Sequence, residues 1–249
     1  MVSESLAGLF RSLRIYHGRP EQTDRMDALY RQFLRPGDLA FDIGSHVGDR
    51  ISSFRRLGTE VVALEPQPLA FRALRLIHGR DRHVHLLQTA CGAKQGTVEL
   101  HVNSANPTVS TTSADFTKAA DGADGWRGQV WDQVIKVPIT TLDTLIAQFG
   151  TPQFTKIDVE GFEADVLEGL SRPLPRLSFE FTTIQREVAY LCLDRLADVG
   201  GYRYNVALGE SQHLEFPAPL SSAEIRRYLG ELPHSANSGD VYAIRDEVH

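Results

Sequence analysis

The stretch Leu39-Ala40-Phe41-Asp42-Ile43-Gly44-Ser45-His46-Val47-Gly48 decides the fold that this sequence predicts. Its apolar first half is typical of a buried strand, and its two glycines indicate a turn that leads into a helix. A second apolar run, Val61-Val62-Ala63-Leu64, ends in Glu65 about one strand–helix unit later. The two runs therefore predict a βαβ unit.

The spacing within this unit also indicates a kind of ligand. An acidic residue about 20 residues after a glycine turn suits the two hydroxyls of a ribose. Gly44 and Gly48 have the spacing G-x-x-x-G, whereas dinucleotide sites have G-x-G-x-x-G and a cradle for the pyrophosphate. The pattern therefore favours a nucleoside without phosphates, of which S-adenosylmethionine (SAM) is the common one.

Composition and charge narrow the class of protein. The chain has 249 residues, enough for one α/β domain with a substantial core. A net charge of −6 argues against broad nucleic-acid binding, which needs a basic face. Cys91 and Cys192 are too few for a disulfide framework or a cysteine zinc site. No apolar run has the length of a signal peptide or a membrane span, so we expect a cytoplasmic protein that binds no membrane.

Strands and helices are expected to alternate along most of the chain. The pattern predicts strands near 39–43, 61–65, 84–88, 154–158, 177–181, 202–207 and 241–245. It predicts helices near 48–57, 68–77, 162–170 and 186–198. This alternation predicts an α/β fold with a mostly parallel sheet and helices on both faces.

Two regions depart from the alternation. Residues 1–35 have helical periodicity, as in Met26, Leu29, Tyr30 and Phe33, and we interpret them as an N-terminal helical extension of a domain at 36–249. Between predicted strands at 97–102 and 134–139, residues 103–132 form an insertion rich in Ser, Thr, Ala, Asp and Gly, which is typical of a functional loop. Its aromatic residues either stack on a sugar and close the pocket or anchor the loop to the core; they are Phe116, Trp126 and Trp131.

A second motif, Lys156-Ile157-Asp158-Val159-Glu160-Gly161-Phe162-Glu163, adds a resemblance to a known family. Together with Phe41-Asp42-Ile43-Gly44 and Glu65-Pro66, it resembles the FkbM family of SAM-dependent methyltransferases. The segments Pro36-Gly37-Asp38, Ala90-Cys91-Gly92 and Thr141-Leu142-Asp143 also fit, so the resemblance covers roughly residues 34–182. It implies a Rossmann-like class I methyltransferase fold with a seven-stranded sheet. Ser45-His46 stands where the family usually has Ala-Asn, which adds a titratable group near the cofactor.

The resemblance implies a cofactor site at the carboxyl ends of the first strands. We expect Gly44 to let the backbone approach the cofactor, Glu65 to bind the ribose, and Asp42 to bind the turn backbone or the methionine amine. Each acid is alternatively an ordinary carboxylate at a strand end. The complete predicted set is Asp42, Gly44, Ser45, His46, Val47, Glu65, Pro66, Ala90 and Asp158.

Three acids are the candidate catalytic residues. Asp158 and Glu160 follow the fourth strand of the family's fold, whose end faces the methyl group, and either can accept a proton from a hydroxyl. The alternative is that acids at a helix start only complement its dipole. Glu180 lies in an apolar strand and is expected to line the substrate pocket. The three carboxylates would be adequate ligands for Mg²⁺ or Ca²⁺, but no compact ligand motif supports this, and we assign no metal.

The sequence thus predicts an O-methyltransferase acting on a hydroxyl of a sugar or secondary-metabolite scaffold, with a possible homo-oligomeric state. One alternative is a SAM-binding or scaffolding protein of the same fold without catalysis. Another is a nicotinamide-dependent oxidoreductase, which Glu65 alone would permit. The missing G-x-G-x-x-G and the 156–163 motif argue against the oxidoreductase.

Overall fold

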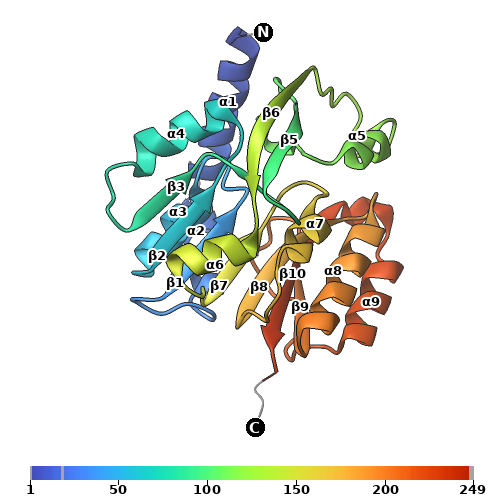
Figure 1. The fold of residues 1–249 in the computed structure, drawn as a ribbon. Coiled ribbons are helices and arrows are strands. Elements are labelled where there is room, and N and C mark those ends of the chain that lie inside the picture. The colour runs from blue at the N-terminus through green and yellow to red at the C-terminus, as the bar shows by residue number, and fades with distance from the viewer. Residues whose placement is uncertain (1, 18–19, 247–249) are drawn as a thin grey trace.

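The computed structural model describes residues 2–17 and 20–246, which fold around a seven-stranded sheet (Figure 1). The strand order is β3-β2-β1-β7-β8-β10-β9, and only β10 runs antiparallel to its neighbours. The strands are β1 (Leu39–Ile43), β2 (Glu60–Leu64), β3 (Val84–Leu87), β7 (Phe154–Ile157), β8 (Arg176–Thr182), β9 (Tyr202–Leu208) and β10 (Ser238–Arg245). The predicted seven-stranded, mostly parallel sheet is confirmed.

Helices cover both faces of this sheet, because side chains alternate between the faces along each strand. In β1, Ala40 packs against α2 (Pro20–Tyr30), α3 (Asp49–Arg56) and α4 (Pro68–His78). Phe41 and Ile43 point the other way and share a core with the second group of helices. That group comprises α6 (Leu142–Phe149), α7 (Glu163–Glu168), α8 (Arg186–Val199) and α9 (Ser222–Glu231). Burial on both faces explains why the strands are continuous apolar runs.

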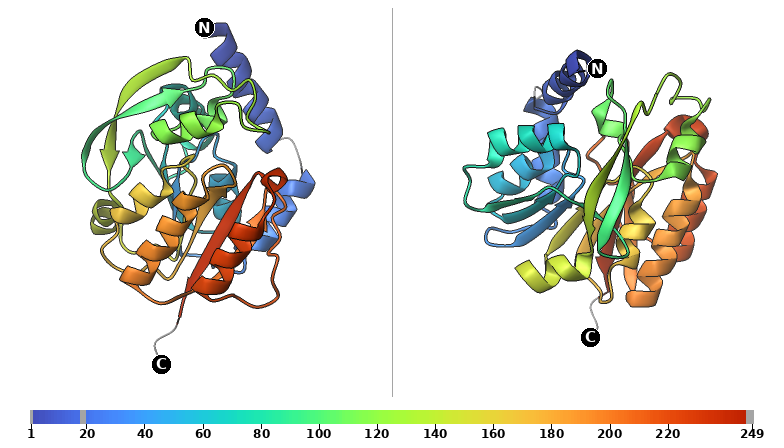
Figure 2. Two further views of the ribbon diagram at one scale, coloured as in Figure 1. Left: turned by 90° about the vertical axis from the view of Figure 1, so that its right-hand side faces the viewer. Right: turned by 45° about the horizontal axis from the view of Figure 1, so that its top comes forward.

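A smaller sheet lies beyond one end of the main sheet, at the top of Figure 1 and at the upper left in the left-hand view of Figure 2. It has the order β4-β6-β5 and comprises β4 (Ala90–Cys91), β5 (Gly96–Val102) and β6 (Gln133–Thr140). The insertion between β5 and β6 contains the short helices η1 (Pro107–Val109) and α5 (Ala114–Ala120).

The prediction that the insertion lacks regular structure is therefore wrong in part. Phe116, at 0% exposed, packs at right angles to Trp126, with ring centroids 5.0 Å apart. Trp131 donates its indole N–H to the Val109 carbonyl at 2.8 Å. Of the two roles considered for these aromatic residues, the structure supports anchoring of the loop.

The N-terminal helix α1 (Val2–His17) lies against the insertion and α4 (Figure 2). A Cβ at Gly8 would lie 2.8 Å from Pro107, so the helix and η1 are in close contact. Helix α2 contributes Tyr30 to the core beside Phe54 and Phe154. The boundary of the extension at residue 35 stays a prediction. None of the described helices has the length and apolar character needed to cross a membrane.

Helix boundaries differ from the prediction in two places. Helix α7 is shorter than the predicted 162–170; Glu160 and Gly161 before it have positive φ angles of 56° and 87°, and Gly169 is its C-cap. Helix α9 was not predicted, since only Ile225 and Leu229 are fully buried along its face. The sequence signal that could have predicted α9 is its capping box, in which Ser221 and Glu224 bond each other's backbone.

Candidate active site

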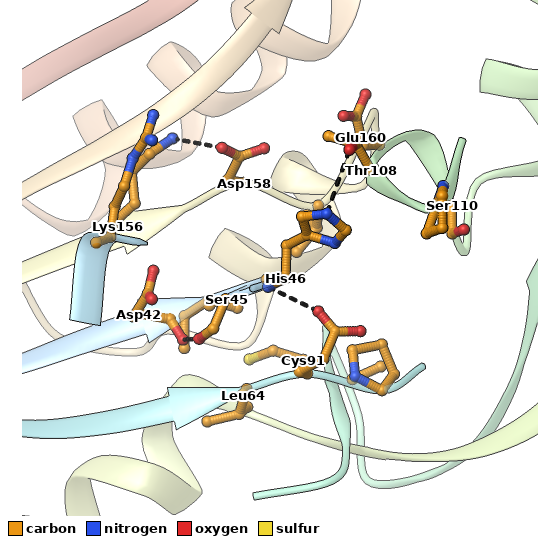
Figure 3. Close-up of a pocket in the computed structure, with 18 of the residues that line it drawn as sticks. Asp42, Ser45, His46, Leu64, Cys91, Thr108, Ser110, Lys156, Asp158 and Glu160 are labelled. Atoms are coloured by element: carbon orange, nitrogen blue, oxygen red, sulfur yellow. Dashed lines mark hydrogen bonds and ion pairs between the residues drawn. The ribbon is translucent and has the colours of Figure 1, made fainter. Parts of the chain in front are cut away.

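An open cleft lies at the carboxyl ends of β1, β2 and β7, where the strand order switches direction. In such sheets this is the usual position of a ligand. Loops after the three strands form one wall, and residues of α1, η1 and the loop after β9 complete it (Figure 3). The empty space that these residues bound is about 910 Å³, part of it open to solvent.

The glycine turn after β1 shapes the bottom of the cleft. Gly44 has φ +89°, and its N–H donates to the Leu64 carbonyl at 3.0 Å. A Cβ there would lie 1.8 Å from the carbonyl oxygen of Asp158. A side chain at position 44 would thus collide first with the end of the neighbouring strand. From the sequence we expected Gly44 only to let the backbone approach the cofactor. Gly48, with φ +81°, makes room for Leu74 and His78 of α4.

Glu65 is fixed at the end of β2 by two backbone donors. Its Oε2 accepts from His46 N at 2.8 Å, and its Oε1 accepts from Gln67 N at 2.7 Å. Burial raises the pKa of Glu65 to about 8, although both backbone N–H groups act to lower it. Each carboxylate oxygen can accept a further hydrogen bond, so the geometry leaves room for the predicted ribose contact.

Asp42 is a buried acid with an unused oxygen. It is 1% exposed, and its Oδ2 has no hydrogen-bond partner, although the residue lines the cleft. Burial, together with the charge of nearby Asp49, raises the pKa of Asp42 to about 7. A buried oxygen of this kind calls for a partner from outside the protein.

His46 connects three parts of the cleft wall. Its φ of 43° places its ring between the insertion and α1. The ring Nε2 and the Thr108 hydroxyl are 3.3 Å apart, and the ring meets Tyr16 edge-on at 5.9 Å between centroids. His46, which stands where the family usually has Asn, therefore joins the turn after β1 to the insertion and to α1.

The end of β7 carries a buried ion-pair network (Figure 3). Lys156, 1% exposed, donates to Asp158 Oδ2 at 3.0 Å and to Asp240 Oδ1 at 2.7 Å. Burial acts to raise the pKa of Asp158, but the positive charges of Lys156 and Arg50, together with hydrogen bonds to Lys156 and Glu180, outweigh it and lower that pKa. Asp158 is therefore ionised at neutral pH.

Glu160 has the opposite electrostatic environment. Burial and the negative charges of Asp158 and Glu163 raise its pKa well above the usual value. Glu180, on β8, has its pKa raised in the same direction by burial and by Glu160 and Asp158. Two acids of raised pKa thus lie beside one acid of lowered pKa, an arrangement that is common at catalytic sites.

Most of the predicted site residues meet in this cleft. The lining includes Asp42, Gly44, Ser45, His46, Glu65, Pro66, Ala90, Asp158 and Glu160. Val47 does not line the cleft, because its side chain packs with Leu9 and Ala73 between α1 and α4. Glu180 lies behind the cleft wall, in a smaller hollow with Gly161 and Gln185.

The sequence analysis missed several residues of the cleft. They are Tyr16, Asp49, Arg50, Lys156 and Glu210. Arg50 binds Asp49 and, at 3.2 Å, Glu210 from the loop after β9. Lys156 lies inside the quoted motif and was available as a signal, since a lysine in an apolar strand needs a partner. No local pattern marks Tyr16 or Glu210.

The fold and the cleft define the class of Rossmann-like SAM-dependent methyltransferases. A TehB-like SAM-dependent methyltransferase from Corynebacterium glutamicum has the same fold, with a TM-score of 0.51, 10% identity and coverage of 98% of each chain. An O-methyltransferase from Bacillus cereus in complex with S-adenosylhomocysteine (SAH) has a TM-score of 0.49, 10% identity and coverage of 96% of this chain and 91% of that one. Precorrin-6y C5,15-methyltransferase from Geobacter metallireducens has a TM-score of 0.47, 14% identity and coverage of 89% and 87%.

The family is more specific than the fold. The profile of the FkbM methyltransferase domain matches residues 42–232, and the chain belongs to this family. It is a SAM-dependent methyltransferase. No curated protein matches its sequence.

The residues of the cleft fit this cofactor. Asp42 offers a buried, unpartnered oxygen that suits an ammonium group, and Glu65 offers acceptors that suit ribose hydroxyls. The acids at the end of β7 would favour a cationic sulfonium. These individual contacts remain predictions.

Proposed function

We propose that the protein methylates a hydroxyl group of a small-molecule acceptor, such as a sugar or a secondary-metabolite scaffold. The observation that supports this most is that Asp158 and Glu160 line the same cleft as Glu65. Carboxylates that can receive a proton thus share one space with the residues that suit a nucleoside. Family membership favours methyl transfer over the oxidoreductase alternative.

SAM, when bound, supplies a methyl group activated by its sulfonium. The protein must therefore hold the acceptor and take up its proton, because an alcohol is too weak an acid to be ionised at neutral pH. Asp158, held ionised by Lys156, attracts positive charge to this end of the cleft. The raised pKa of Glu160 favours its protonated form, so Asp158 is the better placed of the two to accept that proton.

The fit of an acceptor depends on the walls of the cleft. Pro107, Thr108, Ser110 and Thr112, from the insertion, line its outer part. Hydroxyl side chains of this kind bond well to sugar or polyketide oxygens. The net charge of −6 supports the expectation that the acceptor is not a nucleic acid.

Binding of SAH tests the cofactor part of the proposal. We expect one SAH per chain by calorimetry, and Glu65→Ala should cost about 1.5–3 kcal/mol, roughly 10- to 150-fold in affinity. The companion Glu65→Gln keeps the size of the side chain but offers a single acceptor oxygen, so we expect SAH affinity to fall in both variants. Parent-like affinity in both would refute the ribose role.

Transfer of labelled methyl from SAM to a panel of acceptors tests the reaction. Label in the product as an ether, stable to mild base, is the expected result for a hydroxyl acceptor. SAH binding without transfer to any acceptor would instead favour the catalytically silent alternative. Transfer to carbon, nitrogen or RNA would contradict the proposed acceptor class.

A further inference from the structure

Three carboxylates converge at the inner end of the cleft. Asp158 follows β7, Glu160 lies two residues further on, and Glu180 comes from the neighbouring parallel strand β8. One oxygen atom from each lies within 4.8 Å of the other two. Within residues 2–17 and 20–246, no other group of three or more His, Cys, Asp or Glu side chains is arranged in this way.

The spacing suits a shared cation. Two oxygens that bind one ion at about 2.1–2.4 Å cannot be further apart than about 4.2–4.8 Å. The three residues supply only oxygen, the ligand that Mg²⁺, Mn²⁺ and Ca²⁺ prefer.

An unpartnered buried oxygen provides an independent indication of a ligand. Glu160 is only 7% exposed, and its Oε2 has no hydrogen-bond partner; Oε2 of Glu180 is also buried without one. Glu163, at the start of α7, shows how the protein can satisfy a buried carboxylate, because its Oε1 accepts from the N–H of Val159 at 3.0 Å. A buried carboxylate oxygen without a partner is costly, so a proton or a cation must satisfy it.

The protein's own positive charge is already in use nearby. Lys156 donates to Asp158 at 3.0 Å and to Asp240 at 2.7 Å, so one cation is shared by two acids. Glu160 and Glu180 therefore add negative charge that Lys156 does not balance. Like charges at this separation cannot all remain ionised without a counter-charge.

We propose that Asp158, Glu160 and Glu180 form a binding site for one divalent cation, Mg²⁺, Mn²⁺ or Ca²⁺. The sequence alone predicts no metal, because it contains no compact ligand motif; the structure adds that β8 brings Glu180 beside the 156–163 motif. Since Asp158 and Glu160 line the cleft, an acceptor oxygen can reach the ion. A bound cation orients such an oxygen and makes its proton more acidic; this role, unlike the site itself, rests on the proposed function.

Titration with Mn²⁺ tests the site directly, without SAM or acceptor. Free Mn²⁺ is followed by electron paramagnetic resonance at neutral pH with the full chain. We expect one saturable site per chain, from which Mg²⁺ or Ca²⁺ displaces Mn²⁺. Glu160→Gln and Glu180→Gln should each weaken Mn²⁺ binding at least about tenfold, the loss already seen for groups that only support metal ligands.

Glu65→Gln is the matched control. It also neutralises a buried carboxylate of the cleft, but outside the cluster, so its Mn²⁺ affinity should stay within a few-fold of the parent. In thermal unfolding, Mn²⁺ should raise the Tm of the parent and of Glu65→Gln but not that of Glu160→Gln. SAH binding by the two cluster variants confirms that they are folded.

Two outcomes overturn the metal site: no saturable Mn²⁺ binding by the parent, or equal binding by the parent and both cluster variants. The first outcome, combined with normal SAH binding, would mean that protons satisfy Glu160 and Glu180, and the proposed methyl transfer would stand. Conversely, Mn²⁺ binding that depends on the cluster, in a chain that fails to bind SAH, would keep the metal site and refute the proposed function.

Discussion

The lysine–carboxylate network at the end of β7 favours a charged Asp158, a point that its sequence context left open. A carboxylate at a helix start can simply complement the helix dipole. Here the side chain is 31% exposed within the cleft and paired to a lysine that is itself 1% exposed. The protein has placed a lysine in its core, at considerable desolvation cost, to keep this carboxylate charged.

We expect Asp158→Asn to lower kcat by a factor on the order of 10²–10⁴, the usual effect of losing a group that handles a proton. The variant keeps the shape, and Lys156 keeps its bond to Asp240, so the fold should persist. Single-turnover rates with labelled SAM measure the effect, with circular dichroism and SAH binding as controls for folding. A rate within a few-fold of the parent would exclude Asp158 from the reaction.

Residues that follow a strand were predictable, and residues that reach the cleft from elsewhere were not. Glu65 and Asp158 were found because a strand end and a motif mark them locally. Tyr16 and Glu210 enter the cleft through contacts between segments far apart in the sequence. Val47 belongs to the same turn as His46, but its side chain faces α1 and α4 and not the cleft. The positive φ angles of this turn determine which side chain faces the cleft, and they are not evident from the apolar pattern of the sequence.

At the scale of elements, α1 acts as a wall of the cleft. Tyr16 lies at the C-terminal end of this helix, lines the cleft and contacts the His46 ring. We expect Tyr16→Ala to weaken SAH binding by about tenfold, because it removes an aromatic contact and lets water into the site. Phe10→Ala, on the same helix but 67% exposed, is the matched control. Equal SAH affinity in the two variants would show that α1 has no part in the site.

The insertion is the second element that we consider. We expect residues 103–132 to exchange amide hydrogens faster without ligand than with cofactor and acceptor, as a lid does. The buried contact of Phe116 with Trp126 limits this motion to a movement of the insertion as a packed unit. Hydrogen exchange monitored by mass spectrometry, with and without ligands, measures it. Protection as strong in the free enzyme as in the complex would identify a fixed structural element.

Helices and strands were predicted most reliably where the residues of the element itself carried the signal. Apolar residues marked the strands of the main sheet, as a continuous run in β2 but interrupted by Arg203 and Asn205 in β9. Helix α5 has only seven residues, with Phe116 as its one large apolar side chain, and it is stabilised by packing of Phe116 against the insertion's own aromatics. Such long-range packing leaves no periodic pattern, which explains why the insertion was taken for an irregular loop.

At the scale of the whole molecule, buried acids make stability depend on pH. Burial raises the pKa of Glu65 to about 8, and the pKa values of Asp42 and Glu163 to about 7. The unfolded chain loses these protons near pH 4, so the folded protein binds more protons across the window up to about pH 8. The contribution of each group to stability is therefore complete at low pH and is lost as the pH rises through its folded pKa.

We accordingly expect the Tm of the ligand-free protein to fall between about pH 5.5 and pH 8. Each such group contributes a slope of about 1.4 kcal/mol per pH unit while it titrates. Acids of lowered pKa, such as Asp27 and Asp81, act in the opposite sense, but only below about pH 4, where the unfolded chain begins to bind protons. Glu65→Gln removes one titrating group and should flatten the fall, whereas Glu99→Gln, at an exposed position of β5, should not. Differential scanning calorimetry across this pH range measures the Tm of the parent and of the variants. A Tm that rises toward pH 8, or the same slope in Glu65→Gln as in the parent, would contradict the prediction. Either result would mean that the cleft acids are ionised in the free protein and that burial does not control their charge.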